Sequence, residues 1–223
     1  MNHFAFIQYF FYLGINWNWW IALHLLVHEI KGEKKYGLHT TGADELEKAR
    51  AAGVDTSHAT LYMPASYPLL EAVFNELPAS SRHHFLDIGC GKGRAMCVAA
   101  HHGYHQVTGI DFSTEFCLKA EENLLRTRQQ FPSLTFEVLV QEASRYRVPE
   151  DVNCIFFFNP FDRHIMHLVT NNILDSYRAS PRVIHVIYLN PLYKTEFTDI
   201  GFKEVFYTKR LKYMEAVILQ LAP

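Results

Sequence analysis

A glycine-rich turn near the middle of the chain constrains the fold more than any other feature. Residues 84–88 form a short apolar run, and Gly89, Gly91 and Gly93 follow before a helical stretch that begins at Arg94. Glycines permit a tight turn and a close approach of the backbone to a ligand, and the start of a helix presents free N–H groups. The segment therefore predicts a strand, a loop and a helix that bind a nucleotide-like ligand.

Apolar runs alternate with helical segments through most of the remaining chain. We expect strands over 84–88, 106–110, 134–140, 152–158 and 182–189, with helices over 94–102, 115–130 and 163–178 between them. Two last strands, 202–207 and 214–221, are joined by too few residues for a helical crossover, so they should pair antiparallel. The pattern predicts an α/β fold, namely a Rossmann-like, doubly wound, mostly parallel seven-stranded sheet with a C-terminal antiparallel hairpin and an N-terminal helical extension.

An acidic residue ends the second apolar run. Asp111 closes the segment Thr108-Gly109-Ile110-Asp111, where a carboxylate can accept two hydrogen bonds from a ribose diol. Together with Asp87 and the G-x-G-x-G of Gly89–Gly93, it resembles the class I S-adenosylmethionine-dependent methyltransferases, in particular a bacterial group of undefined substrate. The nicotinamide enzymes have G-x-G-x-x-G instead. The resemblance implies S-adenosyl-L-methionine as cofactor and S-adenosyl-L-homocysteine as product.

The resemblance also implies a role for each residue around the glycine turn. The loop backbone, including Cys90, would contact the methionine part of the cofactor, and Asp87 would organise the loop or the amino group. Asp111 would hold the ribose hydroxyls, and Phe112 would lie beside the adenine.

Further cofactor contacts are expected outside the turn. Gln141-Glu142-Ala143 stands where family members often have G-D-A, so Glu142 would accept a bond from the adenine amino group and the Ala143 backbone would meet a ring nitrogen. Tyr62 would approach the methionine end from a covering segment. Two structural alternatives stay open, a solvated turn for Glu142 and a packed loop aromatic for Tyr62.

The segment Asn159-Pro160-Phe161 follows the fourth expected strand. It resembles the [DN]-P-P-[YF] element of amino-group methyltransferases, although the second proline is missing. There the asparagine side chain and the next carbonyl accept hydrogen bonds from the target amine, and the aromatic residue packs on the target. In the alternative interpretation, Pro160 ends a strand and Phe161 belongs to the core.

These observations predict methyl transfer from S-adenosylmethionine, to an amine nitrogen of a protein or a small molecule. Two alternatives belong to other classes: an oxidoreductase with a nucleotide cofactor, or a non-catalytic module that binds an adenosyl ligand and uses its N-terminus for interactions. The net charge of -2 argues against a nucleic-acid acceptor.

The first twenty residues are unusually aromatic and include all three tryptophans of the chain. Residues 4–27 are mostly apolar, but Gln8, Asn16, Asn18 and His24 interrupt the run and argue against a membrane span. We expect a helix over 18–30, capped by Asn18 and ended by Gly32, and a linker over 31–42.

The chain is accordingly divided into two parts. Residues 1–60 form a helical and aromatic extension that serves as a lid or as the interface of a homodimer, and residues 61–223 form the methyltransferase domain. Contact of residues 4–27 with a membrane surface is an open alternative, because tryptophan and tyrosine suit a lipid interface.

Cysteine and histidine usage indicates the compartment and argues against a metal site. The four cysteines form no C-x-x-C pair, which predicts free thiols in a reducing compartment. We therefore expect a cytoplasmic protein, and association with a membrane stays open. The 13 histidines show no three-ligand spacing, so we expect no metal.

Overall fold

The computed structural model describes residues 3–16, 18–42, 63–158, 161–210 and 214–223. Its centre is one seven-stranded sheet with the order β3-β2-β1-β4-β5-β7-β6. The strands are β1 (His84–Ile88), β2 (Gln106–Asp111), β3 (Thr135–Val140), β4 (Cys154–Phe158), β5 (Ile184–Leu189), β6 (Lys203–Arg210) and β7 (Met214–Leu221). β1 to β5 run parallel, whereas β7 is antiparallel to both β5 and β6. The predicted fold class is therefore confirmed.

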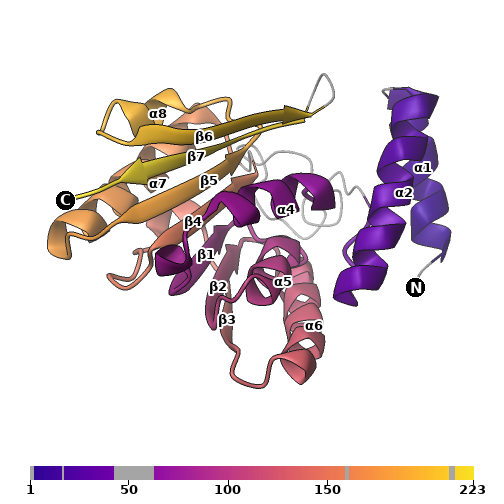
Figure 1. The fold of residues 1–223 in the computed structure, drawn as a ribbon, viewed down its shortest axis with the longest axis horizontal. Helices are drawn as coiled ribbons and strands as arrows, with labels where there is room; N and C mark the ends of the chain where they lie inside the picture. The colour runs from indigo at the N-terminus through magenta and orange to yellow at the C-terminus, as the bar shows by residue number, and fades with distance from the viewer. Residues whose placement is uncertain (1–2, 17, 43–62, 159–160, 211–213) are drawn as a thin grey trace.

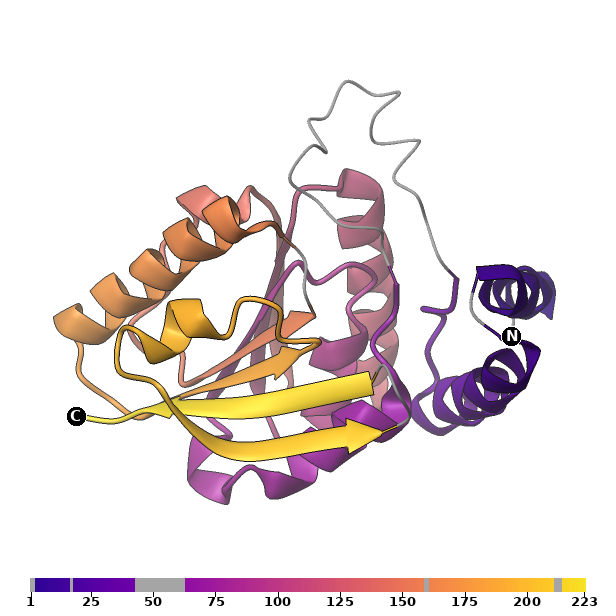
Figure 2. The same cartoon turned by 90° about the horizontal axis from the view of Figure 1, so that it is seen from above.

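Helices cover both faces of the sheet (Figure 2). One face carries α4 (Tyr67–Glu76), α5 (Arg94–His101) and α6 (Thr114–Gln130), and the other carries α7 (Arg163–Ala179) and α8 (Thr195–Thr198). Short 3₁₀ turns occur at η1 (Ala79–Ser81) and η2 (Ala143–Arg145). Because successive side chains of a strand point to opposite faces, Phe156 joins the first core and Phe157 the second.

The apolar composition of the central strands follows from this layering. All five residues of β1 are buried, as expected for a parallel strand between two helical layers. β3 lies at the sheet edge and alternates between exposed and partly buried residues. The helices that follow begin at polar caps: the Ser113 hydroxyl accepts from Phe116 N at 3.3 Å, and Asp162 accepts from Ile165 N at 3.0 Å.

Two N-terminal helices, α1 (His3–Asn16) and α2 (Trp19–Tyr36), stand side by side at one end of the molecule (Figure 1). Asn18 caps α2 as predicted, because its side chain accepts from Trp20 N at 2.8 Å. The predicted stop at Gly32 and the linker from residue 31 are wrong, since α2 continues to Tyr36 and ends at Gly37 with a φ of 69°.

The two glycines of this region differ in their surroundings. Gly32 lies inside the helix against α4, where a Cβ would overlap the ring of Tyr67. Gly37 takes the left-handed conformation, and its N–H group bonds to the Glu33 carbonyl, as is usual for a helix C-terminus. No helix among the described residues is long and apolar enough to cross a membrane.

Candidate active site

The glycine turn lies at the point where the strand order of the sheet reverses. β2 pairs with one side of β1 and β4 with the other. In open α/β sheets, ligands bind outside the carboxyl ends of the strands at such a switch point. The candidate site is therefore the edge at which β1, β2 and β4 end.

The turn folds back onto the end of β2. The N–H groups of Gly89 and Cys90 both donate to the Ile110 carbonyl, at 2.9 and 3.0 Å. Gly93, with a φ of 78°, begins α5 so close to α6 that a Cβ would lie 3.0 Å from the Cβ of Ala120. Glycine at this position thus permits both the backbone turn and the tight packing of α5 on α6.

Asp111 is buried and bonded on both carboxyl oxygens. Oδ2 accepts from Gly91 N and Oδ1 accepts from Ser113 N, each at 2.9 Å. Burial raises the pKa of Asp111 to about 6, although the backbone N–H groups of Ser113, Gly91 and Phe112 oppose the shift. A carboxylate has about four lone-pair sites. Asp111 can therefore accept the two hydrogen bonds of a ribose diol in addition to these two.

Asp87 presents the opposite case, a buried acid with an unsatisfied oxygen. Its side chain is 2% exposed, and Oδ2 has no hydrogen-bond partner among the described residues. Burial, and then the charge of Asp111, raise its pKa well above the ordinary value. Buried polar atoms are nearly always bonded, so an orphaned acceptor at a switch point indicates a missing donor. A cationic amino group would supply that donor.

The other sequence-predicted cofactor residues lie around this edge. Cys90 is a buried thiol whose pKa is raised well above normal by hydrogen bonding with Cys117 and by burial, so it stays neutral. Phe112 is partly buried next to Asp111. Glu142 extends an exposed carboxylate to Arg145 Nε at 3.3 Å, and the buried Ala143 begins η2. Their contacts with the cofactor stay predictions.

Three of the predicted residues, Tyr62, Asn159 and Pro160, lie outside the described part of the chain. Phe161 is described and is buried in the core on the α7 face of the sheet. This placement agrees with the alternative interpretation of Phe161 as a core residue. Its packing on an acceptor stays a prediction.

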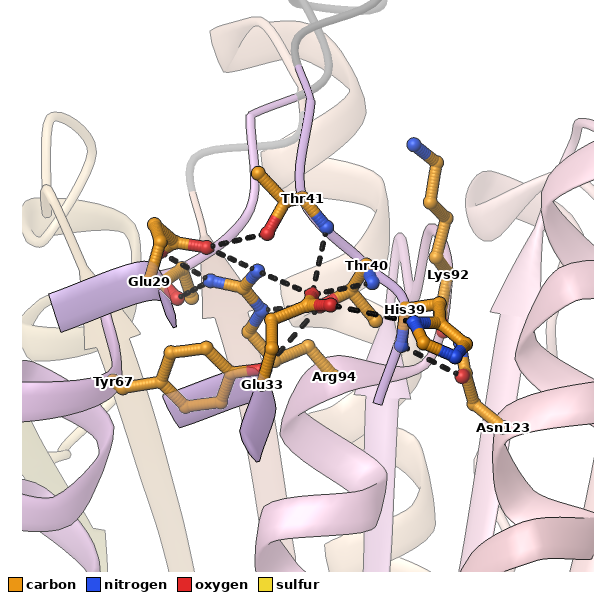
Figure 3. Close-up of polar contacts among 10 residues, drawn as sticks. Glu29, Glu33, His39, Thr40, Thr41, Tyr67, Lys92, Arg94 and Asn123 are labelled. Carbon is orange, nitrogen blue, oxygen red and sulfur yellow. Dashed lines mark hydrogen bonds and ion pairs between the residues drawn. The ribbon is translucent and has the colours of Figure 1, made fainter. Parts of the chain in front are cut away.

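A group of buried polar side chains that was not predicted from the sequence attaches α2 to the glycine turn (Figure 3). Arg94, the residue after Gly93, is 3% exposed. Its Nη1 and Nη2 donate to the two oxygens of Glu29 at 2.7 and 2.6 Å, and its Nε donates to Thr40 Oγ1 at 2.7 Å. The guanidinium also stacks over the Tyr67 ring, at 4.1 Å from its centroid.

A second buried acid, Glu33, holds the segment after α2 against the same site. One oxygen, Glu33 Oε1, accepts from Thr40 N at 2.6 Å, from Thr41 N at 2.9 Å and from Thr40 Oγ1 at 2.9 Å. Further along, Asn123 on α6 accepts from His39 N at 3.1 Å and donates to the Lys92 carbonyl at 3.0 Å. Residues 38–42 are thereby tied to the glycine turn from two sides. The available signal was a pair of acids four residues apart on a largely apolar helix.

The arrangement fits S-adenosylmethionine in two respects. The amino group of its methionine part would give Asp87 Oδ2 the donor it lacks, and Asp111 keeps acceptor capacity for the ribose. The glycine turn allows the backbone to approach the ligand closely between them.

Comparison with known proteins agrees with this geometry. The family described as a methyltransferase domain matches residues 85–179, which contain the glycine turn, Asp111 and the end of β4. No curated protein matches the chain.

Solved structures share the fold at low sequence identity. A candidate methylase from Haemophilus influenzae is 17% identical with a TM-score of 0.55, covering 70% of this chain and 98% of its own. A candidate methyltransferase from Escherichia coli is 14% identical with a TM-score of 0.54 over 72% of this chain and 90% of its own. A SAM-dependent methyltransferase from Aquifex aeolicus is 18% identical with a TM-score of 0.52 over 69% and 89%. These structures show the fold that the chain adopts, and the match of residues 85–179 to the methyltransferase domain supports an S-adenosylmethionine-dependent methyltransferase.

Proposed function

We propose that this protein methylates an amine nitrogen of a protein or a small molecule. The observation that carries the proposal is the register between β1 and β4, in which Asp87 is opposite Phe156. β4 therefore ends at the same sheet edge as the glycine turn, and Asn159-Pro160-Phe161 follow its last residue in the sequence. An amide side chain in that segment suits an amine that must be aligned with the methyl donor.

Methyl transfer requires alignment of the acceptor nitrogen with the methyl group more than it requires acid or base catalysis. The cofactor supplies an electrophilic methyl group, so the chain has to orient a neutral nitrogen in line with it and to exclude water. The side-chain oxygen of Asn159 and the carbonyl of Pro160 would accept the two N–H groups of the amine, which leaves its lone pair directed at the methyl carbon. A site of low dielectric lowers the pKa of an ammonium group and so favours the neutral amine.

Composition supports a protein or small-molecule acceptor over a nucleic acid. The chain carries 21 basic and 23 acidic residues, and its sequence has no long basic stretch of the kind that binds phosphate backbones. All four cysteines are free and buried, which suits a reducing cytoplasm. These are the conditions that we propose for the reaction.

The test is transfer of labelled methyl groups into a cell extract that is then separated into protein, nucleic acid and small molecules. We expect label in the protein or small-molecule fraction, in linkages that are stable as methylamines. Asn159→Ala should reduce transfer on the order of a hundredfold through lost alignment, and calorimetry should show unchanged affinity for S-adenosylhomocysteine. Asn75→Ala, on the exposed side of α4, is the matched control and should retain full transfer.

Several results would contradict the proposal. Label in nucleic acid or in methyl esters would exclude an amine acceptor of the proposed classes. Full transfer by Asn159→Ala would remove the role of that side chain. Binding of S-adenosylhomocysteine without any transfer would favour the non-catalytic alternative, and binding of a nicotinamide cofactor instead would favour the oxidoreductase.

A further inference from the structure

The pair of N-terminal helices exposes a row of large apolar side chains. Ile7, Phe11 and Ile15 follow one another at intervals of four residues along α1, which places them on one helix face. On α2 the corresponding residues are Trp19, Trp20, Leu23 and Val27. The exposed fractions of these seven side chains range from 40% to 77%.

The two rows belong to one surface. Trp19 bridges the helices, because its ring lies 6.0 Å from the ring of Phe11 and 5.6 Å from that of Phe10. Beneath the surface, Leu13 and Ala22 are fully buried where α1 and α2 pack together. Monomeric soluble proteins rarely expose contiguous apolar patches of more than a few hundred square ångströms, and larger ones mark interaction sites.

The charges of the helix pair are separated between its two faces. Residues 1–36 contain only two acids, Glu29 and Glu33, and both are buried around Arg94 on the side that faces the sheet domain. The exposed charged residues of α2 are all lysines: Lys31, Lys34 and Lys35. Lys35 pairs with Glu71 of α4 at 2.7 Å.

The lysines continue the apolar row of α2 instead of opposing it. Trp20, Leu23, Val27, Lys31 and Lys34 are spaced by three or four residues, so they share one helix face. Along this face, a tryptophan is followed by two aliphatic residues and then by two lysines. These residue types suit a lipid interface, where tryptophan lies among headgroups and the long lysine side chains reach anionic phosphates.

From this geometry we infer that the outer face of α1 and α2 binds the surface of an anionic lipid bilayer. The helices lie on the bilayer surface and do not cross the bilayer. The apolar row enters the boundary between acyl chains and headgroups, and Lys31 and Lys34 contact anionic headgroups. A second copy of the chain is the less suitable occupant. Its helix pair would bring the same lysines and no exposed acid to the shared surface, which leaves the positive charge without a complement.

The chain contains its own probe for this inference. All three tryptophans lie at residues 17, 19 and 20, so tryptophan fluorescence reports only on the junction of the two helices. With vesicles of phosphatidylcholine and phosphatidylglycerol, we expect a blue shift, protection from acrylamide and co-sedimentation of the full-length protein. With vesicles of phosphatidylcholine alone, binding should be on the order of tenfold weaker or more, and high salt should abolish the difference.

Substitutions separate the apolar and charged contributions. Ile15→Glu places a charge in the apolar row at an exposed position and keeps every tryptophan, so it should abolish binding without changing the unfolding temperature. Lys31→Glu with Lys34→Glu should remove the preference for anionic vesicles. Leu118→Glu is the matched control, since it makes the same change at a 57% exposed position on α6 and should bind as the native protein does.

Vesicle binding and oligomeric state together decide whether this face binds lipid. Undiminished vesicle binding by Ile15→Glu would overturn the inference. So would absence of vesicle binding together with a dimer, seen in sedimentation velocity, that Ile15→Glu dissociates, because the face would then be an interface between copies. Affinity for S-adenosylhomocysteine, measured on each variant, is expected to stay constant and reports separately on the methyltransferase domain.

Discussion

Two pairs of buried acids flank the glycine turn, and they differ in whether a cation lies beside them. Glu29 and Glu33 surround Arg94, and their hydrogen bonds join α2 to the sheet domain. Asp87 and Asp111 have no cation beside them among the described residues, and the pKa of each is raised. The first pair shares one buried cation and serves the fold. The second pair has none, which is the condition of a site that receives a charged ligand.

The largest effect is expected when the cation Arg94 is removed from the first pair, Glu29 and Glu33. Arg94→Met leaves the carboxylates of Glu29 and Glu33 buried without the cation beside them, so we expect a loss of about 3–5 kcal/mol in the free energy of unfolding. Urea denaturation followed by circular dichroism measures it. Arg178→Met, at an exposed ion pair with Asp175, is the control and should change stability by less than about 0.5 kcal/mol.

A double variant sharpens the same test. Combining Arg94→Met with Glu29→Gln removes one of the uncompensated charges. The double variant should therefore lose less free energy of unfolding than the sum of the losses in the two single variants. Strict additivity would mean that the ion pair contributes no coupling and that packing alone holds α2 in place.

The next largest effect is expected on ligand affinity, at the second pair, Asp87 and Asp111. Asp111→Ala removes the acceptors proposed for the ribose, and hydrogen bonds to charged groups contribute about 1.5–3 kcal/mol each. Two such bonds sum to roughly 3–6 kcal/mol, so affinity for S-adenosylhomocysteine should fall by about a hundredfold or more in calorimetry. The exposed Asp175→Ala is the control. Unchanged affinity would show that Asp111 shapes the turn without contacting the ligand.

The titration of Asp111 gives a smaller effect. Its pKa is raised to about 6, so the carboxylate is ionised at pH 8 and takes up a proton as the pH falls through 6. The protonated form is the weaker acceptor, and affinity should decline on the acid side of about pH 6, by up to roughly tenfold per pH unit. Calorimetry from pH 8 to pH 5 checks this, and Asp111→Asn should flatten the profile.

The smallest signal concerns Asp87. Because burial raises its pKa in the free protein, a cationic amino group beside Asp87 would lower that pKa and favour release of a proton. Binding of S-adenosylmethionine should release up to about one proton per site, measured as a dependence of the binding heat on the ionisation enthalpy of the buffer. No proton release in native protein, or the same release in Asp87→Asn, would contradict this account of Asp87.

The strands and the glycine turn could be predicted because their signals are local. Each depends on a short run of apolar residues, on a glycine or on a cap such as Ser113, and the structure places them within a few residues of the predicted bounds. The helix end at Gly32 was predicted wrongly because glycine has two uses. It ends a helix where its φ is positive, as at Gly37, and it admits a neighbouring ring where its φ is helical, as at Gly32 beside Tyr67.

The sequence by itself determined the fold class and the position of the glycine turn with Asp87 and Asp111, since periodicity and turn residues act over a few positions. Only the tertiary structure decided which acids have a cation beside them. Arg94 and Glu29 are 65 residues apart and meet at 2.6 Å because α2 packs across α4 and α5. It also decided that the N-terminal helices turn Glu29 and Glu33 inward and Trp19 and Trp20 outward, since the direction of a helix face is set by what the helix packs against.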